Sequence, residues 1–267
     1  LFQCGGVFDA KLWLNVNGKF IDATEQYRLD SLSGYFIQGA TAADFNNDGY
    51  DDFIVTNFGK GLSNGDKKHP VVLMNVEGKY FEPIKLDAIL EKGYYSAATV
   101  GDINKDGFTD IYLTNYLTSM GEIEDSITGE IGYDPTCAEN KLLINDNGEG
   151  FKEMSKEYNL NDGGCGLSAL LIDLDNDNDL DLVITSQSGY VFYYENQAQN
   201  PGDPCVFVAQ NHSVQTLTLP YLPMPDFYDL NGDSLLDFIC GSGDGTLHYY
   251  ENIGTKTNAV FDGSPAG

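Results

Sequence analysis

The feature that most constrains this chain is an acidic nonapeptide that occurs four times along its 267 residues. In the first copy, residues 44–52, acidic or amide side chains stand at positions one, three, five and nine, and a glycine stands at position six. Alternate side chains of such a loop converge as the backbone curls, and oxygen ligands suit Ca²⁺. The copies begin at Asp44, Asp102, Asp173 and Asp229, so they recur at intervals of roughly 55 to 70 residues. This period is typical of a repeat architecture with one supersecondary unit per repeat.

We predict that the loops bind three to four Ca²⁺ ions, through positions one, three, five and nine together with position seven. The predicted ligands are Asp44, Asn46, Asp48, Tyr50, Asp52, Asp102, Asn104, Asp106, Phe108, Asp110, Asp173, Asp175, Asp177, Asp179, Asp181, Asp229, Asn231, Asp233, Leu235 and Asp237. Two loops depart at position six, where Asn178 and Ser234 replace glycine. Asn tolerates a positive φ better than Ser, although Gly232 can relax the fourth turn.

The nonapeptides allow two other interpretations. An EF-hand needs a Glu at position twelve and flanking helices, but position twelve is Val55, Leu113, Ile184 or Cys240, and the following segments are β-branched or aromatic. The second interpretation is an acidic turn without a metal, because Asp and Asn favour turns. Without a cation, however, four or five carboxylates and amides within nine residues would repel one another. We therefore favour calcium.

A second recurring segment follows the loops and reads as a strand, an Asn/Gly turn and another strand. Its copies are residues 12–20, 72–81, 142–151, 191–196 and 247–261. Each full repeat then contains four short strands, which predicts an all-β fold, a β-propeller of four-stranded blades. Four full blades plus a partial one are visible, giving a five-bladed propeller or part of a larger one. We expect a single calcium-binding domain over residues 1–267, with repeat units at about 1–24 (partial), 25–83, 84–155, 156–209 and 210–263.

The loops resemble those of the FG-GAP/VCBS repeat family, the calcium-bearing blades also seen in integrin α-subunit propellers. Residues 39–44, 142–148 and 166–169 look like the cartilage-acidic-protein type of these repeats, and residues 245–255 look like the VCBS variety. The resemblance covers most of residues 10–263. It implies a propeller with Ca²⁺ but no particular function, because propellers host binders and enzymes alike. The Phe-Gly and Gly-Ala-Pro signature of the family is not intact, so the resemblance implies no integrin-like ligand role.

Charge and hydropathy limit the partners. The formal net charge is −27, so nucleic acid and anionic membrane surfaces are disfavoured as partners. The sequence has no apolar run that could span a bilayer, which predicts no direct membrane insertion. Loops of modest affinity fill where calcium is millimolar, which favours an extracellular location. Asn211 begins an N-glycosylation acceptor that is compatible with secretion, and the start at Leu1 suggests a mature product or a fragment.

Five cysteines occur without any C-x-x-C pair, which argues against zinc or thioredoxin-like chemistry. Residues 116–140 form a longer connection than a blade needs, and such segments are functional or disordered. Cys137 in this connection and Cys165 are expected on the face opposite the nonapeptides, where a disulfide would pin the long segment. Cys4 and Cys240 are expected towards the same face, with a pairing only if the ring closes. Cys205 is left as the odd cysteine.

No catalytic constellation is evident, because the three histidines are scattered over different repeats. We expect an extracellular, calcium-stabilised propeller that acts as a protein- or glycan-binding or adhesion module, with structural calcium and no catalytic residues. The expected binding surface is the face opposite the loops, which carries residues 116–140. The first alternative is a polysaccharide-active, lyase-like enzyme on a calcium propeller. The second is a structural spacer of a larger surface protein.

Overall fold

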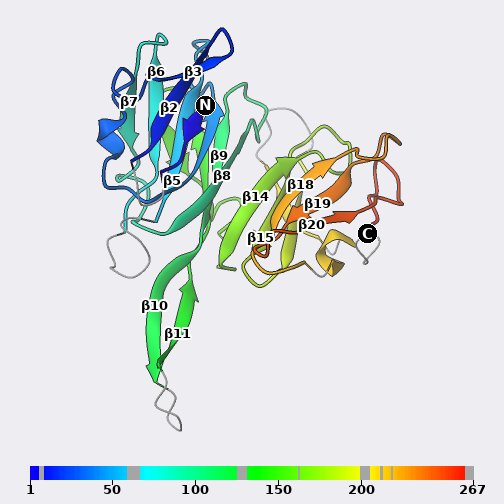
Figure 1. Cartoon of the computed structure of the whole chain (residues 1–267). Helices are drawn as coiled ribbons and strands as arrows, with labels where there is room; N and C mark the ends of the chain where they lie inside the picture. Colours follow the sequence, from blue (N-terminus) through cyan, green and yellow to red (C-terminus); the bar gives the residue numbers. More distant parts are fainter. Residues whose placement is uncertain are drawn as a thin grey trace.

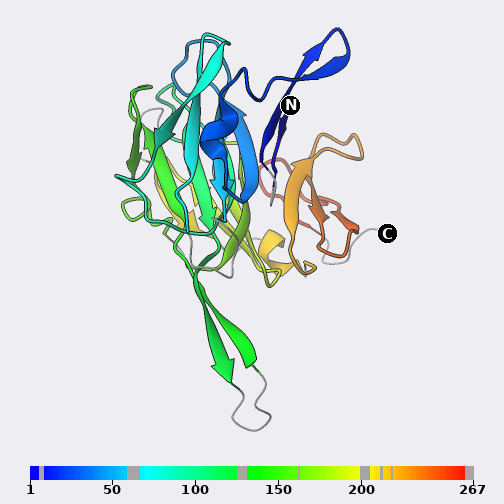
Figure 2. The ribbon, with the colours of Figure 1, turned by 60° about the vertical axis from the view of Figure 1, so that its left-hand side comes forward.

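Five small antiparallel sheets follow one another around a ring in the computed structural model of this chain (Figures 1 and 2). The structure describes residues 1–5, 9–58, 67–124, 131–161, 163–198, 205–210, 213–217 and 219–261. Within these residues the chain is all-β, with two short 3₁₀ helices, η1 (Leu29–Leu32) and η2 (Ser213–Thr216). The predicted β-propeller is therefore confirmed, with five blades. The predicted glycosylation site at Asn211 lies outside the described residues.

The blades are numbered in chain order. Blade 1 contains β1 (Phe2–Gln3), β2 (Lys11–Val16) and β3 (Lys19–Asp22), and blade 2 contains β4 (Ile37–Ala43), β5 (Asp52–Asn57), β6 (Val71–Val76) and β7 (Tyr80–Lys85). Blade 3 contains β8 (Tyr95–Gly101), β9 (Asp110–Asn115), β12 (Lys141–Asn145) and β13 (Phe151–Glu153). Blade 4 contains β14 (Gly166–Ile172), β15 (Asp181–Ser186), β16 (Val191–Asn196) and β17 (Phe207–Ala209), and blade 5 contains β18 (Met224–Tyr228), β19 (Asp237–Gly241) and β20 (Leu247–Tyr250).

Each nonapeptide joins the first two strands of its blade, as the sequence predicts. Loops 1 to 4 (residues 44–52, 102–110, 173–181 and 229–237) connect β4 to β5, β8 to β9, β14 to β15 and β18 to β19. The strand after the loop is a continuous apolar run, because it is covered on both faces. In β9 and β15 every residue is buried. Strands rather than helices follow the loops, which agrees with the rejection of an EF-hand.

The core lies between neighbouring blades. In blades 2, 3 and 4 the third residue of the strand that follows the loop points to the next blade, and this residue is Ile54, Tyr112 or Val183, each with no exposed surface. Ile54 packs with Ile111 of blade 3, and Val183 packs with Phe238 of blade 5. Within the described residues the buried inter-blade clusters join blades 1 and 2, 2 and 3, 3 and 4, and 4 and 5.

The described residues of the segment 116–140 are mostly in strands and not in an irregular connection. It contains a hairpin of β10 (Leu117–Glu124) and β11 (Ile131–Cys137), whose backbone pairs from Leu117–Cys137 to Glu124–Ile131. The hairpin projects away from the ring on the side opposite loops 1 to 4 (Figures 1 and 2). At its base, the Thr118 hydroxyl donates a hydrogen bond to the Thr136 carbonyl at 3.1 Å. Ladder bonds along the strands satisfy the backbone polar groups that a long loop would leave to solvent.

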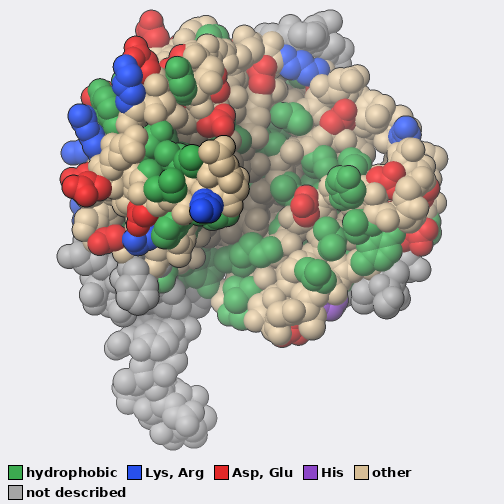
Figure 3. Space-filling model, turned by 45° about the horizontal axis from the view of Figure 1, so that its top comes forward, with side chains coloured by type: hydrophobic (Ala, Val, Ile, Leu, Met, Phe, Trp, Pro, Cys, Tyr) green, Lys and Arg blue, Asp and Glu red, His purple; other side chains and the backbone are tan. Residues whose placement is uncertain are grey.

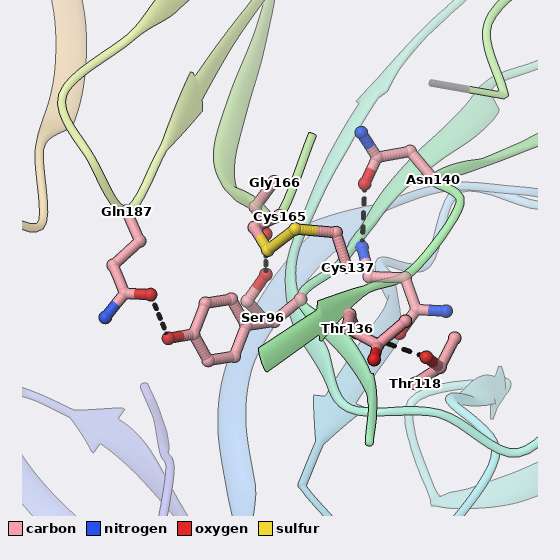
Figure 4. The surroundings of a disulfide bond; sticks show 10 residues. Ser96, Thr118, Thr136, Cys137, Asn140, Cys165, Gly166 and Gln187 are labelled. Carbon is pink, nitrogen blue, oxygen red and sulfur yellow. Dashed lines mark hydrogen bonds between the residues drawn. A yellow bond between two sulfur atoms is a disulfide. The ribbon is translucent and has the colours of Figure 1, made fainter. Parts of the chain in front are cut away.

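The predicted Cys137–Cys165 disulfide is present and joins the end of β11 to the residue before β14 (Figure 4). Cys4, Cys205 and Cys240 carry free thiols. Cys240 stands near the end of β19 away from loop 4 and is buried in the core between blades 4 and 5, and it forms no pair with Cys4. None of the helices in the described part of the chain has the length and apolar character needed to cross a bilayer.

Candidate functional site

The four loops share one hydrogen-bonding pattern, which turns their side chains inward. The carboxylate at position one accepts hydrogen bonds from the backbone N–H groups at positions five and six. Asp44 accepts from Asp48 and Gly49 at 3.1 and 2.8 Å, and Asp102 accepts from Asp106 and Gly107 at 3.0 and 2.9 Å. Asp173 and Asp229 make the same pairs of bonds. One repeated turn therefore brings the odd-numbered positions together.

The left-handed backbone that this turn needs is present in every loop. Position six has a positive φ in Gly49 and Gly107 and also in Asn178 and Ser234, at 72° and 71°. The two substitutions for glycine therefore keep the turn. Gly232 supplies the positive φ of position four, which is also left-handed in the other three loops, so it does not relax the turn at Ser234.

Position nine of each loop is a fully buried carboxylate held by backbone donors. Asp110 accepts from the N–H of Ile103 at 2.9 Å and from the N–H of Asn145 in the blade's hairpin at 2.8 Å. Asp52, Asp181 and Asp237 make the equivalent two bonds and have no exposed surface. Burial raises the pKa of Asp110 to about 7, and neighbouring carboxylates of the same loop add to this effect. Burial likewise raises the pKa of Asp181 to about 7.

Positions one, three and five converge in the third loop. One carboxylate oxygen from each of Asp173, Asp175 and Asp177 lies within 4.8 Å of the others. In the other loops positions three and five also touch, because the side-chain amide of Asn46, Asn104 or Asn231 donates to the carboxylate two residues later at about 3 Å. The atoms available as metal ligands are all oxygens, because an Asn side chain that donates through its amide nitrogen can also offer its carbonyl oxygen to a cation. The set fits a hard divalent cation such as Ca²⁺.

The residues at position seven differ from the other predicted ligands in the atom that they could offer to a cation. The side chains of Tyr50, Phe108 and Leu235 cannot ligate a hard cation, so only their backbone carbonyl oxygens could do so. The carboxylate of Asp179 is buried and forms an ion pair with Lys105 of loop 2. The structure thus assigns the Asp179 side chain to an inter-loop contact.

The opposite face carries a chain of aromatic and hydroxyl groups near the disulfide. The hydroxyl of Tyr116 donates to the side-chain oxygen of Gln187, and the amide nitrogen of Gln187 donates to the Tyr221 hydroxyl at 2.5 Å. The rings of Phe58 and Tyr116 stack with their centroids 6.2 Å apart. Tyr221 is 60% exposed, whereas Tyr116 is buried, and burial raises the pKa of the Tyr116 hydroxyl. We call Phe58, Tyr116, Gln187 and Tyr221 the aromatic tract.

Sequence reasoning did not find the aromatic tract, because its members come from different repeats. A positional signal does exist. Phe58, Tyr116 and Gln187 each directly follow the second strand of their blade, β5, β9 and β15. Equivalent strands end at the same face of a propeller, so residues at this offset meet there.

The comparisons with known proteins add only a distant structural likeness. No protein-family model matches the chain, and no curated protein matches it. One similar solved structure is a glycoside hydrolase family 43 β-xylosidase/α-arabinofuranosidase from a compost microbial metagenome, in complex with xylotriose and in calcium-free form. It shares 15% identity over 95% of this chain and 78% of that chain, with a TM-score of 0.41.

Another similar structure is a lectin of Agrocybe aegerita that recognises non-reducing terminal N-acetylglucosamine. Its identity is 15% over 98% of this chain and 77% of that chain, and the TM-score is 0.39. Similarities at this level are too weak to assign a function.

Proposed function

We propose that this chain is an extracellular, calcium-stabilised β-propeller that binds a glycan on the face opposite the loops. The observation that carries the calcium part is the buried carboxylate at position nine of every loop. A buried carboxylate is costly unless it is protonated or compensated by a cation, and each one lies beside further oxygen donors. A bound Ca²⁺ would supply that compensation and fix the turn between two strands.

Calcium has a structural role in this proposal. The residues that would hold it are those at positions one, three, five and nine of loops 1 to 4, with backbone oxygens of position seven. Because the ion binds the folded loop and not the unfolded chain, it stabilises the native state by mass action. An extracellular location supplies the millimolar calcium that such loops need, and the Cys137–Cys165 disulfide suits an oxidising compartment.

The aromatic tract is the proposed glycan-binding surface. Carbohydrate sites combine flat apolar surfaces with a few fixed polar groups, and this tract offers the exposed ring of Tyr221 at one end of a hydrogen-bonded chain of Tyr and Gln side chains, with the stacked Phe58 and Tyr116 rings at the other end. Tyr221 presents its ring and hydroxyl to solvent. The projecting β10–β11 hairpin borders the same face and favours a second candidate, a protein partner held by this arm.

The calcium part is tested by thermal unfolding of the protein before and after chelation. We expect EDTA to lower the melting temperature by more than 10 °C, because loss of even two tightly bound ions removes several kcal/mol, and about 1 kcal/mol shifts the melting temperature of a chain of this size by about 2–4 °C. An unchanged melt after removal of bound calcium, verified by atomic emission, would refute the structural role.

The glycan part is tested on a glycan array with Tyr221→Ala. The matched control is Tyr228→Ala, which removes a tyrosine that is 66% exposed on blade 5, outside the aromatic tract. We expect the first variant to lose about tenfold or more in affinity, equivalent to about 1.4 kcal/mol, and the control to bind normally. A product assay on each bound polysaccharide separates a binding module from a polysaccharide-active enzyme. Binding of no glycan, with capture of a protein through the hairpin, would favour the second candidate.

A further inference from the structure

Loops 1 and 2 are joined by the hairpin asparagine of blade 3. The backbone N–H of Asn145 donates to the position-nine carboxylate of Asp110 at 2.8 Å. The side-chain amide of the same residue donates to the carbonyl of Phe45, at position two of loop 1, also at 2.8 Å. One residue therefore holds a predicted ligand of loop 2 and the backbone of loop 1, and it is buried.

The same arrangement joins loops 2 and 3. The backbone N–H of Asn196 donates to Asp181 at 2.9 Å, and its side-chain amide donates to the carbonyl of Ile103, at position two of loop 2, at 3.4 Å. The equivalence of Asn145 and Asn196 shows that the link belongs to the repeat and is not an accident of one blade.

Direct contacts between neighbouring loops run parallel to these links. They come from position four, the left-handed residue at the tip of each turn. The amide of Asn47 in loop 1 donates to the carbonyl of Gly107 in loop 2 at 2.9 Å. In loop 2, Lys105 at position four pairs with Asp179 of loop 3, and the Asp179 side chain is only 5% exposed. Loops 1, 2 and 3 thus form one contiguous network.

Loop 4 lies outside this network in the described part of the structure. Asn252 takes the place of Asn145 and Asn196, and its N–H holds Asp237 at 2.9 Å. Its side-chain amide donates to Leu236 within its own loop at 3.1 Å, as that of Asn145 also does to Thr109 at 3.0 Å, but within the described residues it makes no bond to loop 3. Between loops 3 and 4 the structure has a cavity of about 260 Å³, lined by Asn176 of loop 3 and Ser234 of loop 4 among others.

We infer that loops 1, 2 and 3 bind calcium as a coupled set and that loop 4 binds it independently. This inference rests on the proposed calcium binding. An ion that orders loop 1 fixes the Phe45 carbonyl, which holds Asn145 and through it Asp110, so part of the ordering that loop 2 requires is already complete. Coupling of this kind is a shared free energy between sites and is reciprocal.

The experiment is a calcium titration of the full chain followed by NMR. The backbone amides at position six, in Gly49, Gly107, Asn178 and Ser234, each donate to the position-one carboxylate of their own loop and report its occupancy separately. The variant Asp106→Ala empties loop 2. Its matched control is Asp233→Ala, which removes the equivalent position-five carboxylate and the same charge from loop 4.

We expect Asp106→Ala to weaken calcium binding at loops 1 and 3 by about fivefold or more, the lower end of typical coupling, and to leave loop 4 unchanged. Asp233→Ala should leave loops 1 to 3 unchanged. A second pair of variants tests the asparagine link itself: Asn145→Ala should reduce the response of loop 1 to Asp106→Ala, with the Asn47–Gly107 contact carrying the remainder, whereas Asn252→Ala should leave that response unchanged. Circular dichroism melts of the calcium-loaded variants verify that each one folds.

The outcomes distinguish the coupling between loops from the proposed calcium binding on which it rests. If no loop binds calcium, the proposed structural role of calcium fails and the coupling falls with it. If all four loops bind calcium but loops 1 and 3 do not respond to Asp106→Ala, calcium binding stands and the coupling is overturned. An equal response of loop 4 to Asp106→Ala also overturns it, because a general electrostatic effect would then be the cause.

Discussion

Blades 2 to 4 and the two end blades place apolar residues at the same positions but bury them differently. Ile54 in blade 2 and Ile239 in blade 5 both stand two residues after the position-nine aspartate, yet Ile54 has no exposed surface and Ile239 is half-buried. Blade 5 further exposes 66% of Tyr228 and 75% of Leu247. In Figure 3 a recess separates the half of the molecule that carries blade 1 from the half that carries blade 5.

Blade 1 shows the complementary difference. Phe20 faces Asn15 across its hairpin, as Phe81 faces Asn75 in blade 2. Phe81 is 3% exposed and packs between blades, whereas Phe20 is 59% exposed. Each blade therefore carries an interface pattern on both faces whether or not a neighbour covers it, and the energetic value of the pattern depends on the neighbour.

The largest expected effect compares identical substitutions at these equivalent positions. Ile54→Ala should lower the free energy of unfolding by about 3–4 kcal/mol, because it leaves a cavity in a fully buried interface. Ile239→Ala should cost only about 1 kcal/mol, since its site is partly open to solvent. Urea denaturation of both variants in calcium measures the difference. Equal losses would show that blade 5 is covered in solution.

A second prediction concerns the disulfide, which ties blade 3 to blade 4 and has no counterpart between blades 4 and 5 among the described cysteines. The paired substitution Cys137→Ser and Cys165→Ser should lower the free energy of unfolding by about 3 kcal/mol, as expected for opening a covalent loop of this size. Cys4→Ser, which removes a free and partly exposed thiol, is the control and should change it by less than about 0.5 kcal/mol. The denaturation midpoints of the double variant and of the Cys4→Ser control measure the two changes.

The third prediction concerns the pH dependence of the calcium-free protein. Because burial raises the pKa of Asp110 and Asp181 to about 7, the native state binds more protons than the unfolded chain between about pH 4 and 7. The free energy of unfolding should therefore fall as the pH rises through this window. Calcium should flatten the slope, because a cation favours the charged carboxylates.

Asp110→Asn should also reduce that slope, whereas Asp146→Asn, which changes an exposed carboxylate paired with Lys152, should not. Denaturation in EDTA at four pH values between 4.5 and 7.5 measures it. A stability that rises with pH would contradict the prediction.

The sequence predicts most of the blade structure because blades are set by local chemistry. The Asp-rich turns, the Asn/Gly hairpins and the apolar strands between them each follow from residues close together in the chain. The Cys137–Cys165 pair was also predictable, since strand connections alternate between the two faces. Asp181 and its equivalents could be predicted as candidate ligands because their position in the loop repeats.

The remaining features depend on contacts between blades, which the spacing of residues does not encode. Gln187 joins Tyr116 to Tyr221 only because three blades end at the same face. Asp179 reads as a ligand of its own loop, but Lys105 of the neighbouring loop pairs with it. The sequence predicts only a long connection at residues 116–140, because Glu, Gly and Pro residues are poor strand formers, whereas the structure has the β10–β11 hairpin there. In each case tertiary pairing overrides the local preference.

The bond between Cys137 and Cys165 has a mechanical consequence. Cys137 ends the arm that projects from blade 3, and Cys165 lies just before the first strand of blade 4. Tension applied at the tip of the arm would therefore enter the body through two neighbouring sheets at once. Because the disulfide divides the force between two blades, pulling on the arm should not break the hydrogen bonds between β12 and β9 one after another.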